Sequence, residues 1–163
     1  MSKRLYIIRH AKSSWAEAGM KDIDRPLNGR GKENAPDMGK HLKANFDVPN
    51  FVVSSPAKRA MQTARRICDQ IDYPKNEIQQ VKEIYEAAPD TLLEIINSLP
   101  NDKDIVYLFG HNPGMSMITS YLTDDYLTFK TCCIAVVDFE VNDWNAVSKG
   151  NGSIAAFLSP HDL

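Results

Sequence analysis

The sequence has few cysteines and no long hydrophobic run. Its three cysteines, Cys68, Cys132 and Cys133, form an odd number without the spacing of metal ligands, and two adjacent cysteines cannot easily bridge each other. We expect them to be reduced and packed as small apolar residues, with a catalytic thiol at Cys132 or Cys133 as the less favoured alternative. No apolar stretch approaches membrane-spanning length, and the first apolar run is too short for a signal peptide core. The sequence therefore predicts a cytoplasmic protein with no membrane partner.

Neither sign of charge dominates the sequence. Nineteen Lys and Arg residues against 21 Asp and Glu residues give a formal net charge of -2. A surface built to bind a nucleic-acid backbone is normally basic, so nucleic acid is not expected as a partner, although a local basic pocket fits within this average. With 43% hydrophobic and 25% charged residues, the 163-residue chain has the composition of one globular domain. We therefore predict a single domain over residues 1–163.

Short apolar runs alternate with segments of helical length, which is typical of a sheet covered by helices. The runs predict strands at residues 4–8, 51–54, 78–82 and 104–109, and helices at residues 28–44, 56–71, 90–99 and 113–122, with Pro56 in the first turn of its helix and Asp90 as a cap. The runs "CCIAVVDFEV" and "SIAAFLS" predict an antiparallel hairpin joined across "SKGNG". The expected fold is an α/β three-layer sandwich, in which helices cover both faces of a mostly parallel central sheet that ends in this hairpin.

Polar residues follow three of the predicted parallel strands. The first strand leads into Arg9 and His10, the second into "SSPAKRAMQTA" with Arg59, and the third into "GHNPG" with His111. Because the carboxyl ends of parallel strands share one edge of a sheet, these four side chains are expected to converge there. Two arginines and two histidines would form a pocket for an anion.

Phosphate suits such a pocket better than carboxylate does. Guanidinium groups donate paired hydrogen bonds to phosphoryl oxygens, and the helix amino ends expected at Pro56 and Pro113 add favourable dipoles. One histidine can attack phosphorus as a neutral imidazole while the other donates to the charge that builds up on the transferred group. This scheme needs no metal and no cofactor.

The motifs "RHAKSSW", "SSPAKRAMQTA" and "GHNPG" resemble those of the histidine phosphatase superfamily, whose fold is phosphoglycerate mutase-like. With "DRPLNGRG", the chain is most similar to the small SixA-like phosphohistidine phosphatases, and the resemblance covers residues 4–122. It implies that His10 is the nucleophile that becomes phosphorylated, that Arg9 and Arg59 bind the phosphate ion, and that His111 is a further donor. Ala11 departs from the family pattern, where glycine is common, and would be strained if a positive φ were required there.

For other positions of the site, the sequence allows more than one role. Ser13 occupies the small hydroxyl position of the first motif and either contacts the phosphate or closes the turn. The resemblance implies an acid before the third helix, where we favour Glu83 over Glu86 because Glu83 lies just past the strand; the alternative is that both are solvated carboxylates. The loop of residues 16–26 follows His10 and is expected at the rim.

The chain has no spare length for the segments that cover the pocket in larger superfamily members, so we predict a domain without a cap insertion. An open pocket suits a phosphorylated side chain on a protein surface. The predicted function is a metal-independent phosphohistidine phosphatase that acts on a protein through a phosphohistidine intermediate. The alternatives are a small-molecule phosphomonoesterase or mutase of the same superfamily, a phospho-binding module without turnover, and a hydrolase with a metal on His10 and His111, neither of which has an aspartate cluster close to it.

Overall fold

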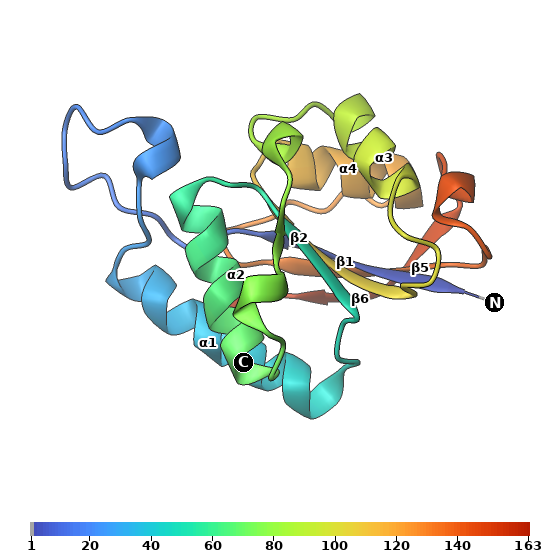
Figure 1. The fold of residues 1–163 in the computed structure, drawn as a ribbon, viewed down its shortest axis with the longest axis horizontal. Coiled ribbons are helices and arrows are strands. Elements are labelled where there is room, and N and C mark those ends of the chain that lie inside the picture. Colours follow the sequence, from blue (N-terminus) through green and yellow to red (C-terminus); the bar gives the residue numbers. More distant parts are fainter. Residues whose placement is uncertain (1) are drawn as a thin grey trace.

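A computed structural model describes residues 2–163 of the chain (Figure 1). Six strands form one sheet in the order β3-β2-β4-β1-β5-β6. Their bounds are Lys3–Arg9 (β1), Phe51–Ser54 (β2), Gln79–Gln80 (β3), Ile105–Gly110 (β4), Ile134–Phe139 (β5) and Gly152–Leu158 (β6). Strands β1 to β4 pair in parallel, whereas β5 pairs antiparallel with both β1 and β6. The predicted parallel sheet with an antiparallel C-terminal hairpin is confirmed.

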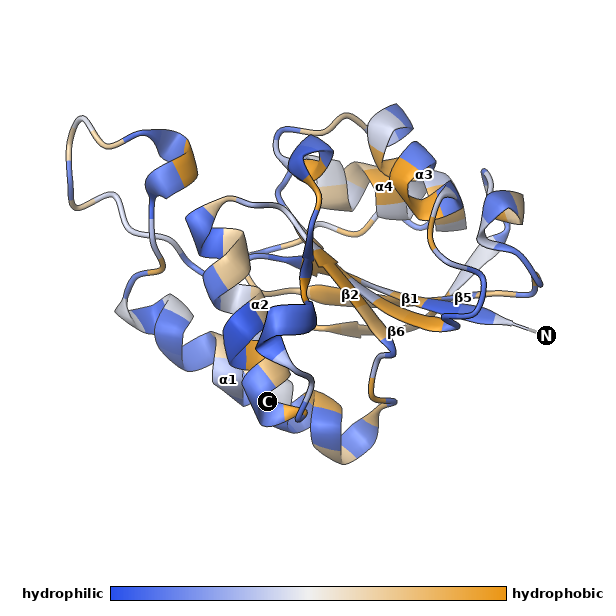
Figure 2. Ribbon diagram, in the orientation of Figure 1, coloured by the Kyte–Doolittle hydropathy of each residue, from blue (hydrophilic) through white to orange (hydrophobic). Residues whose placement is uncertain are grey.

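Helices cover both faces of the sheet, as predicted. Helices α1 (Gly29–Asn45) and α2 (Lys58–Gln70) lie on one face, and α3 (Pro89–Asn97) and α4 (Gly114–Thr123) lie on the other (Figure 1). Figure 2 shows hydrophobic colour concentrated on the central strands and hydrophilic colour along much of α1. This distribution is what a sheet buried between two helical layers requires.

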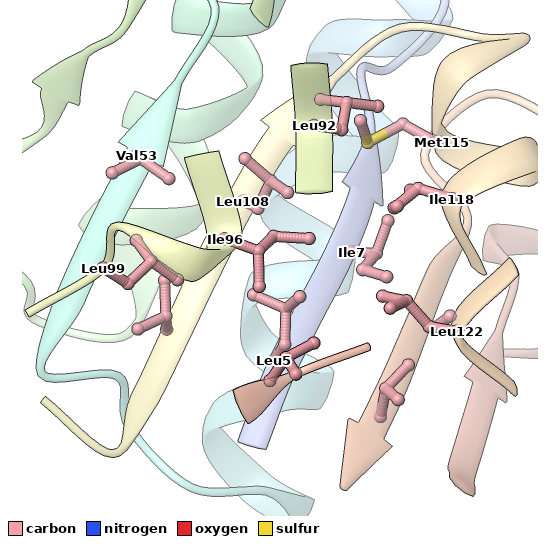
Figure 3. Close-up of a cluster of buried hydrophobic side chains, with 14 of the residues drawn as sticks. Leu5, Ile7, Val53, Leu92, Ile96, Leu99, Leu108, Met115, Ile118 and Leu122 are labelled. Atoms are coloured by element: carbon pink, nitrogen blue, oxygen red, sulfur yellow. The ribbon is translucent and has the colours of Figure 1, made fainter. Parts of the chain in front are cut away.

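The central strand β1 supplies both cores. Successive side chains of a strand point to opposite faces, so Leu5 and Ile7 pack in one cluster while Tyr6 and Ile8 pack in the other, all four fully buried. Figure 3 shows Leu5 and Ile7 beside side chains of α3 and α4. Burial on both faces holds β1 firmly and fixes where its carboxyl end lies.

The four helix starts differ from the predicted ones by one or two residues, and at α2 and α3 the difference changes the role of a named residue. Helix α3 begins at Pro89 after the extended residue Ala88, so Asp90 lies in the first turn and is not the cap. The reason is that Pro89 has no N–H to satisfy and its fixed φ suits the first helical position. Helix α2 begins at Lys58, so Pro56 precedes the helix and does not lie in its first turn.

Among residues 2–163, no helix is both long enough and apolar enough to cross a membrane. The three cysteines are free and buried, and burial raises the pKa of the Cys68 and Cys132 thiols to about 12. Thiols in such surroundings stay protonated near neutral pH and pack as apolar groups.

Candidate active site

The carboxyl ends of β1, β2 and β4 meet at one edge of the sheet. Strand β4 lies between the other two, and its last residues accept hydrogen bonds from both sides: His10 N donates to Gly110 O at 3.1 Å and Ser55 N donates to Phe109 O at 3.0 Å. The ring centroids of His10 and His111 are 5.2 Å apart. The structure therefore brings the two predicted histidines together.

His10 is held as a neutral ring with a defined proton position. Its side chain is buried, and Nδ1 lies 2.7 Å from Ala11 O. Because a carbonyl oxygen can only accept, Nδ1 carries the ring proton and Nε2 keeps its lone pair. Desolvation, together with the charges of His111, Arg59 and Arg9, lowers the pKa of His10 to about 3. At neutral pH the residue presents an uncharged imidazole nitrogen, which is the nucleophilic form.

The strain that a positive φ would impose at Ala11 does not arise. Ala11 is fully buried and is not among the non-glycine residues with positive φ. Its N–H donates to Thr63 Oγ1 at 2.9 Å, and the same hydroxyl donates to Arg59 O at 2.8 Å. One threonine thus ties the segment after β1 to the first turn of α2, which carries Arg59.

His111 follows β4 and is also neutral. Burial and the charge of Arg59 lower its pKa to about 4. Nε2 lies 2.7 Å from Ser55 Oγ, which already accepts from Ala57 N at 3.2 Å, so the hydroxyl proton is free to go to Nε2. The ring proton is then on Nδ1, which is buried and has no partner. Sequence reasoning missed Ser55, although it stands at a strand end inside the motif "SSPAKRAMQTA".

Unpaired donors are concentrated at this site. Among residues 2–163, four buried side-chain polar atoms lack a hydrogen-bond partner, and three of them are Arg9 Nε, Arg59 Nε and His111 Nδ1. The fourth, the Tyr6 hydroxyl, belongs to the core under α1 and α2. Buried polar atoms are normally satisfied, so three nitrogen donors left free around a neutral histidine indicate a site for an anion.

A cleft of ≈ 530 Å³ opens at this edge, and the two candidate acids differ in their relation to it. Glu86 lines the cleft together with Arg59 and His111, whereas Glu83 lines a separate groove beside Phe51. The 3-10 turn η3 (Lys82–Ile84) redirects the chain after β3, and the left-handed φ of 57° at Glu86 then turns the backbone at the cleft. The geometry therefore favours Glu86, not the preferred Glu83.

Asp22 is the main residue that the sequence reasoning missed. It lies in η1 (Asp22–Asp24), where Oδ2 accepts from the Tyr85 hydroxyl and from Arg59 Nη2 at 3.0 Å, while its main-chain O accepts from Arg59 Nη1 at 2.7 Å. Arg25 Nε donates to Oδ1 at 3.1 Å. The hydrogen bonds from Tyr85, Arg59 and Arg25 hold the pKa of Asp22 well below its usual range. The loop of residues 16–26 thus reaches the site and places a carboxylate against its arginine.

Ser13 closes the turn in this structure. Its hydroxyl accepts from Arg25 Nη1 at 2.7 Å, and its backbone forms an isolated bridge with Leu27. The guanidinium carbon of Arg25 lies 3.6 Å from the ring centroid of Trp15, so the loop is held on two sides. Of the two readings of Ser13, the contacts favour turn closure.

No metal-binding group of three or more His, Cys, Asp and Glu residues occurs in the part of the chain that the structure describes.

The comparisons with known proteins agree with the motifs. A family model described as the histidine phosphatase superfamily (branch 1) matches residues 5–88. An uncharacterised protein of Mycobacterium tuberculosis is 32% identical over 164 residues, which covers 94% of this chain and 99% of that protein. The resemblance drawn from the sequence is confirmed.

Two solved structures extend the likeness to the whole chain. A candidate phosphohistidine phosphatase SixA from Agrobacterium tumefaciens is 27% identical, with a TM-score of 0.81 over 97% of this chain and 98% of that one. Another candidate SixA, from Nakamurella multipartitia, has a TM-score of 0.86 at 22% identity and covers 98% of this chain and 97% of that one. The fold is therefore the one that SixA-like proteins share.

Proposed function

Because the chain belongs to the histidine phosphatase superfamily, we propose that it is a phosphohistidine phosphatase that hydrolyses phosphohistidine on a protein through a phosphorylated His10. One observation carries the proposal: the charges of His111, Arg59 and Arg9 act on neutral His10, and each of these three residues has a buried nitrogen without a partner, namely Nδ1 of His111 and Nε of the two arginines. A tetrahedral phosphoryl group offers acceptors for all three donors and an electrophile for the histidine.

In the proposed first step, His10 Nε2 attacks the phosphorus in line with its bond to the substrate's imidazole. That P–N bond breaks, its electron pair stays on the leaving nitrogen, and the leaving ring takes up a proton. Arg9 and Arg59 hold the non-bridging oxygens, and His111 donates from Nδ1 to the charge that builds up on them. Glu86 is the proposed proton donor because it lines the cleft.

In the proposed second step, water attacks the phosphorylated His10. The attacking water gives a proton to the Glu86 carboxylate left by the first step, the bond from phosphorus to Nε2 breaks, its electron pair returns to the ring, and inorganic phosphate leaves. The hydrogen bond from Nδ1 to Ala11 O keeps the ring in the orientation and tautomer that the next cycle needs. No step uses a metal, and we propose that the enzyme is metal-independent.

We also propose that the chain is a single domain without a cap insertion and that the protein is cytoplasmic. Every β-strand of the described residues belongs to one sheet, and helices α1 to α4 pack on it. Three free, buried cysteines are compatible with a reducing compartment.

The test is a comparison of substrates combined with trapping of the intermediate. We expect faster turnover of a phosphohistidine-bearing carrier protein than of a panel of sugar phosphates, and an acid-labile radiolabel on His10 after rapid quenching. EDTA should leave the rate unchanged, and His10→Ala should lose the label and the activity with an unchanged circular dichroism spectrum. Faster turnover of the sugars would favour a small-molecule phosphomonoesterase, and binding without release of phosphate would favour a phospho-binding module.

A further inference from the structure

A second cavity, of ≈ 320 Å³, is lined by five basic side chains from separate segments of the chain. Arg9 comes from the end of β1, Lys12 from the following loop, Arg30 from the first turn of α1, Lys130 from the loop before β5, and His161 from the 3-10 turn η5 (Pro160–Asp162). The remaining lining residues of this cavity are uncharged, so within residues 2–163 it has no acidic lining. We call these five residues the basic cavity.

The cations of the basic cavity have no carboxylate partners in the described chain. The ion pairs of residues 2–163 involve other cations, such as Lys3, Arg4, Lys43 and Lys75. None of these ion pairs involves a lysine or arginine of the basic cavity. At the opposite end of β1, by contrast, Arg4 faces both Asp47 and Asp138. Clustered like charges repel one another, and a bound anion relieves that repulsion; the whole chain, by contrast, has a net charge of -2. The cluster is therefore a local feature that needs its own explanation.

Backbone packing brings these cations together. Gly31 is buried in the first turn of α1, and a Cβ at that position would lie 2.2 Å from Lys12 O. Only glycine allows the amino end of α1 to approach the loop of Lys12 so closely. The positive end of the α1 dipole therefore adds to the side-chain charges of Arg30 and Lys12.

The basic cavity adjoins the candidate active site through Arg9. Its Nη1 donates to Phe129 O at 2.8 Å, and the same oxygen accepts from Asn112 Nδ2 at 2.9 Å; Asn112 lines the catalytic cleft. The positive charge of Arg9 also contributes to the lowered pKa of both His10 and His111. A group bound in the basic cavity would therefore lie beside the phosphoryl group on the same substrate.

We propose that the basic cavity binds the carboxylates of acidic residues that flank the phosphorylated histidine of the protein substrate. This inference rests on the proposed function, because it names the kind of phosphohistidine segment that the site selects. Three cations around the cavity are exposed: Lys12, Arg30 and Lys130. Their side chains can therefore adjust to the positions of the carboxylates in a bound segment. Arginine and lysine in such a cluster favour an acidic sequence and steer its approach.

The test compares two phosphohistidine peptides that differ only in flanking residues, Glu in one and Gln in the other. At low ionic strength we expect the KM of the wild-type protein to be about tenfold lower for the Glu peptide, and the preference to shrink as salt is added. The double variant Arg30→Gln/Lys130→Gln should bring the two KM values together, and its kcat on para-nitrophenyl phosphate should stay that of the wild type. The single variant Lys130→Gln, which removes one exposed charge, should lose part of the preference.

Lys40→Gln is the matched control, since Lys40 is an exposed cation farther along α1 and outside the cavity. It should keep the full preference for the Glu peptide. Equal KM values in the wild type, an undiminished preference in the double variant, or the same loss in Lys40→Gln would each overturn the proposal. Tighter inhibition by a small bisphosphate than by the Glu peptide would also overturn it.

A binding measurement separates this inference from the proposed function. Fluorescence polarisation with labelled Glu and Gln peptides that carry a non-hydrolysable phosphohistidine analogue requires no turnover. Tighter binding of the Glu peptide by the wild type but not by the double variant supports the basic cavity even if phosphohistidine is not hydrolysed. Equal binding of both peptides overturns the inference even if phosphohistidine is hydrolysed.

Discussion

The two histidines of the candidate site use opposite ring nitrogens toward the protein. His10 donates from Nδ1 to a backbone carbonyl and keeps Nε2 free, whereas His111 has Nε2 beside Ser55 and Nδ1 without a partner. Burial keeps both rings neutral at pH 7. One ring is therefore arranged to supply a lone pair and the other to supply a proton, which are the two roles that attack on a phosphoryl group requires.

Ser55→Ala tests the positioning role of the Ser55 hydroxyl. Without it, either nitrogen of His111 can carry the proton, so we expect kcat to fall about tenfold with little change in KM, because the lost donor acts on developing charge. Ser55→Thr should restore part of the rate. Ser54→Ala removes the adjacent buried hydroxyl, whose Oγ donates to Ser55 O, and should leave kcat nearly unchanged. A loss of stability without a change in kcat would mean that Ser55 is only structural.

Asp22→Asn tests how the Asp22 carboxylate, which accepts a hydrogen bond from Arg59, affects the binding of phosphate. Asp22 Oδ2 competes with a phosphoryl oxygen for Arg59 Nη2, while the main-chain O of Asp22 still holds Nη1 in the variant. The Asp22 side chain is about half exposed, which weakens its pairing with the buried Arg59, so we expect the inhibition constant for inorganic phosphate to fall only about threefold. Asp24→Asn in the same 3-10 turn is the control and should change nothing. A higher inhibition constant in Asp22→Asn would show instead that this carboxylate orients the arginine for phosphate.

At the scale of the elements, the sequence predicts the strands and helices with strong apolar periodicity well, whereas the strand predicted at residues 78–82 is reduced to two exposed residues, Gln79–Gln80. Strand β2 has the predicted bounds, and α1 differs by one residue at each end. The helix starts at α2 and α3 were misplaced, since a proline near a helix start fits either just before it or at its first position. Patterns of burial thus reveal an element, while local backbone geometry decides where it begins.

The residues of the candidate site also fall into two groups, those that the sequence predicts and those that it does not. His10, Arg59 and His111 follow strand ends, so their convergence follows from the sheet alone. The contact of Asp22 with Arg59 depends on how a long loop returns to α2, and the choice between Glu83 and Glu86 depends on a turn with a left-handed residue. No periodicity in the sequence carries that information.

Gly31→Ala tests the packing of α1 against the loop after β1. The added Cβ would meet Lys12 O at 2.2 Å, and that oxygen also accepts from Asn28 N, so the backbone must shift. We expect the free energy of unfolding to drop by about 2 kcal/mol or more, measured by urea denaturation. Gly29→Ala, in the same helix with nothing near its Cβ, should be neutral or stabilising by up to roughly 1 kcal/mol. Equal effects of the two variants would contradict the close approach.

At the scale of the whole molecule, the sheet order places the proposed chemistry at the ends of central, buried strands. Strands β1 and β4 are central and buried on both faces, and they carry His10 and His111 on their carboxyl ends. The rigid scaffold can hold two neutral, buried imidazoles that would otherwise gain protons in mild acid. Burying these groups makes the stability of the domain depend on pH.

The stability of the protein should fall as the pH drops from about 6.5 toward 4. The pKa of His10 is lowered to about 3 and that of His111 to about 4, while both rings titrate near 6.5 in the unfolded chain. Between these values the unfolded state binds more protons than the native state, so the free energy of unfolding rises with pH across this window and levels off above it. We expect a loss on the order of a few kcal/mol from pH 7 to pH 4 in urea denaturation, beyond any contribution of carboxylates. His10→Ala should flatten this slope, whereas His161→Ala, at the exposed histidine of η5, should not. An unchanged slope in His10→Ala would mean that His10 is not held neutral.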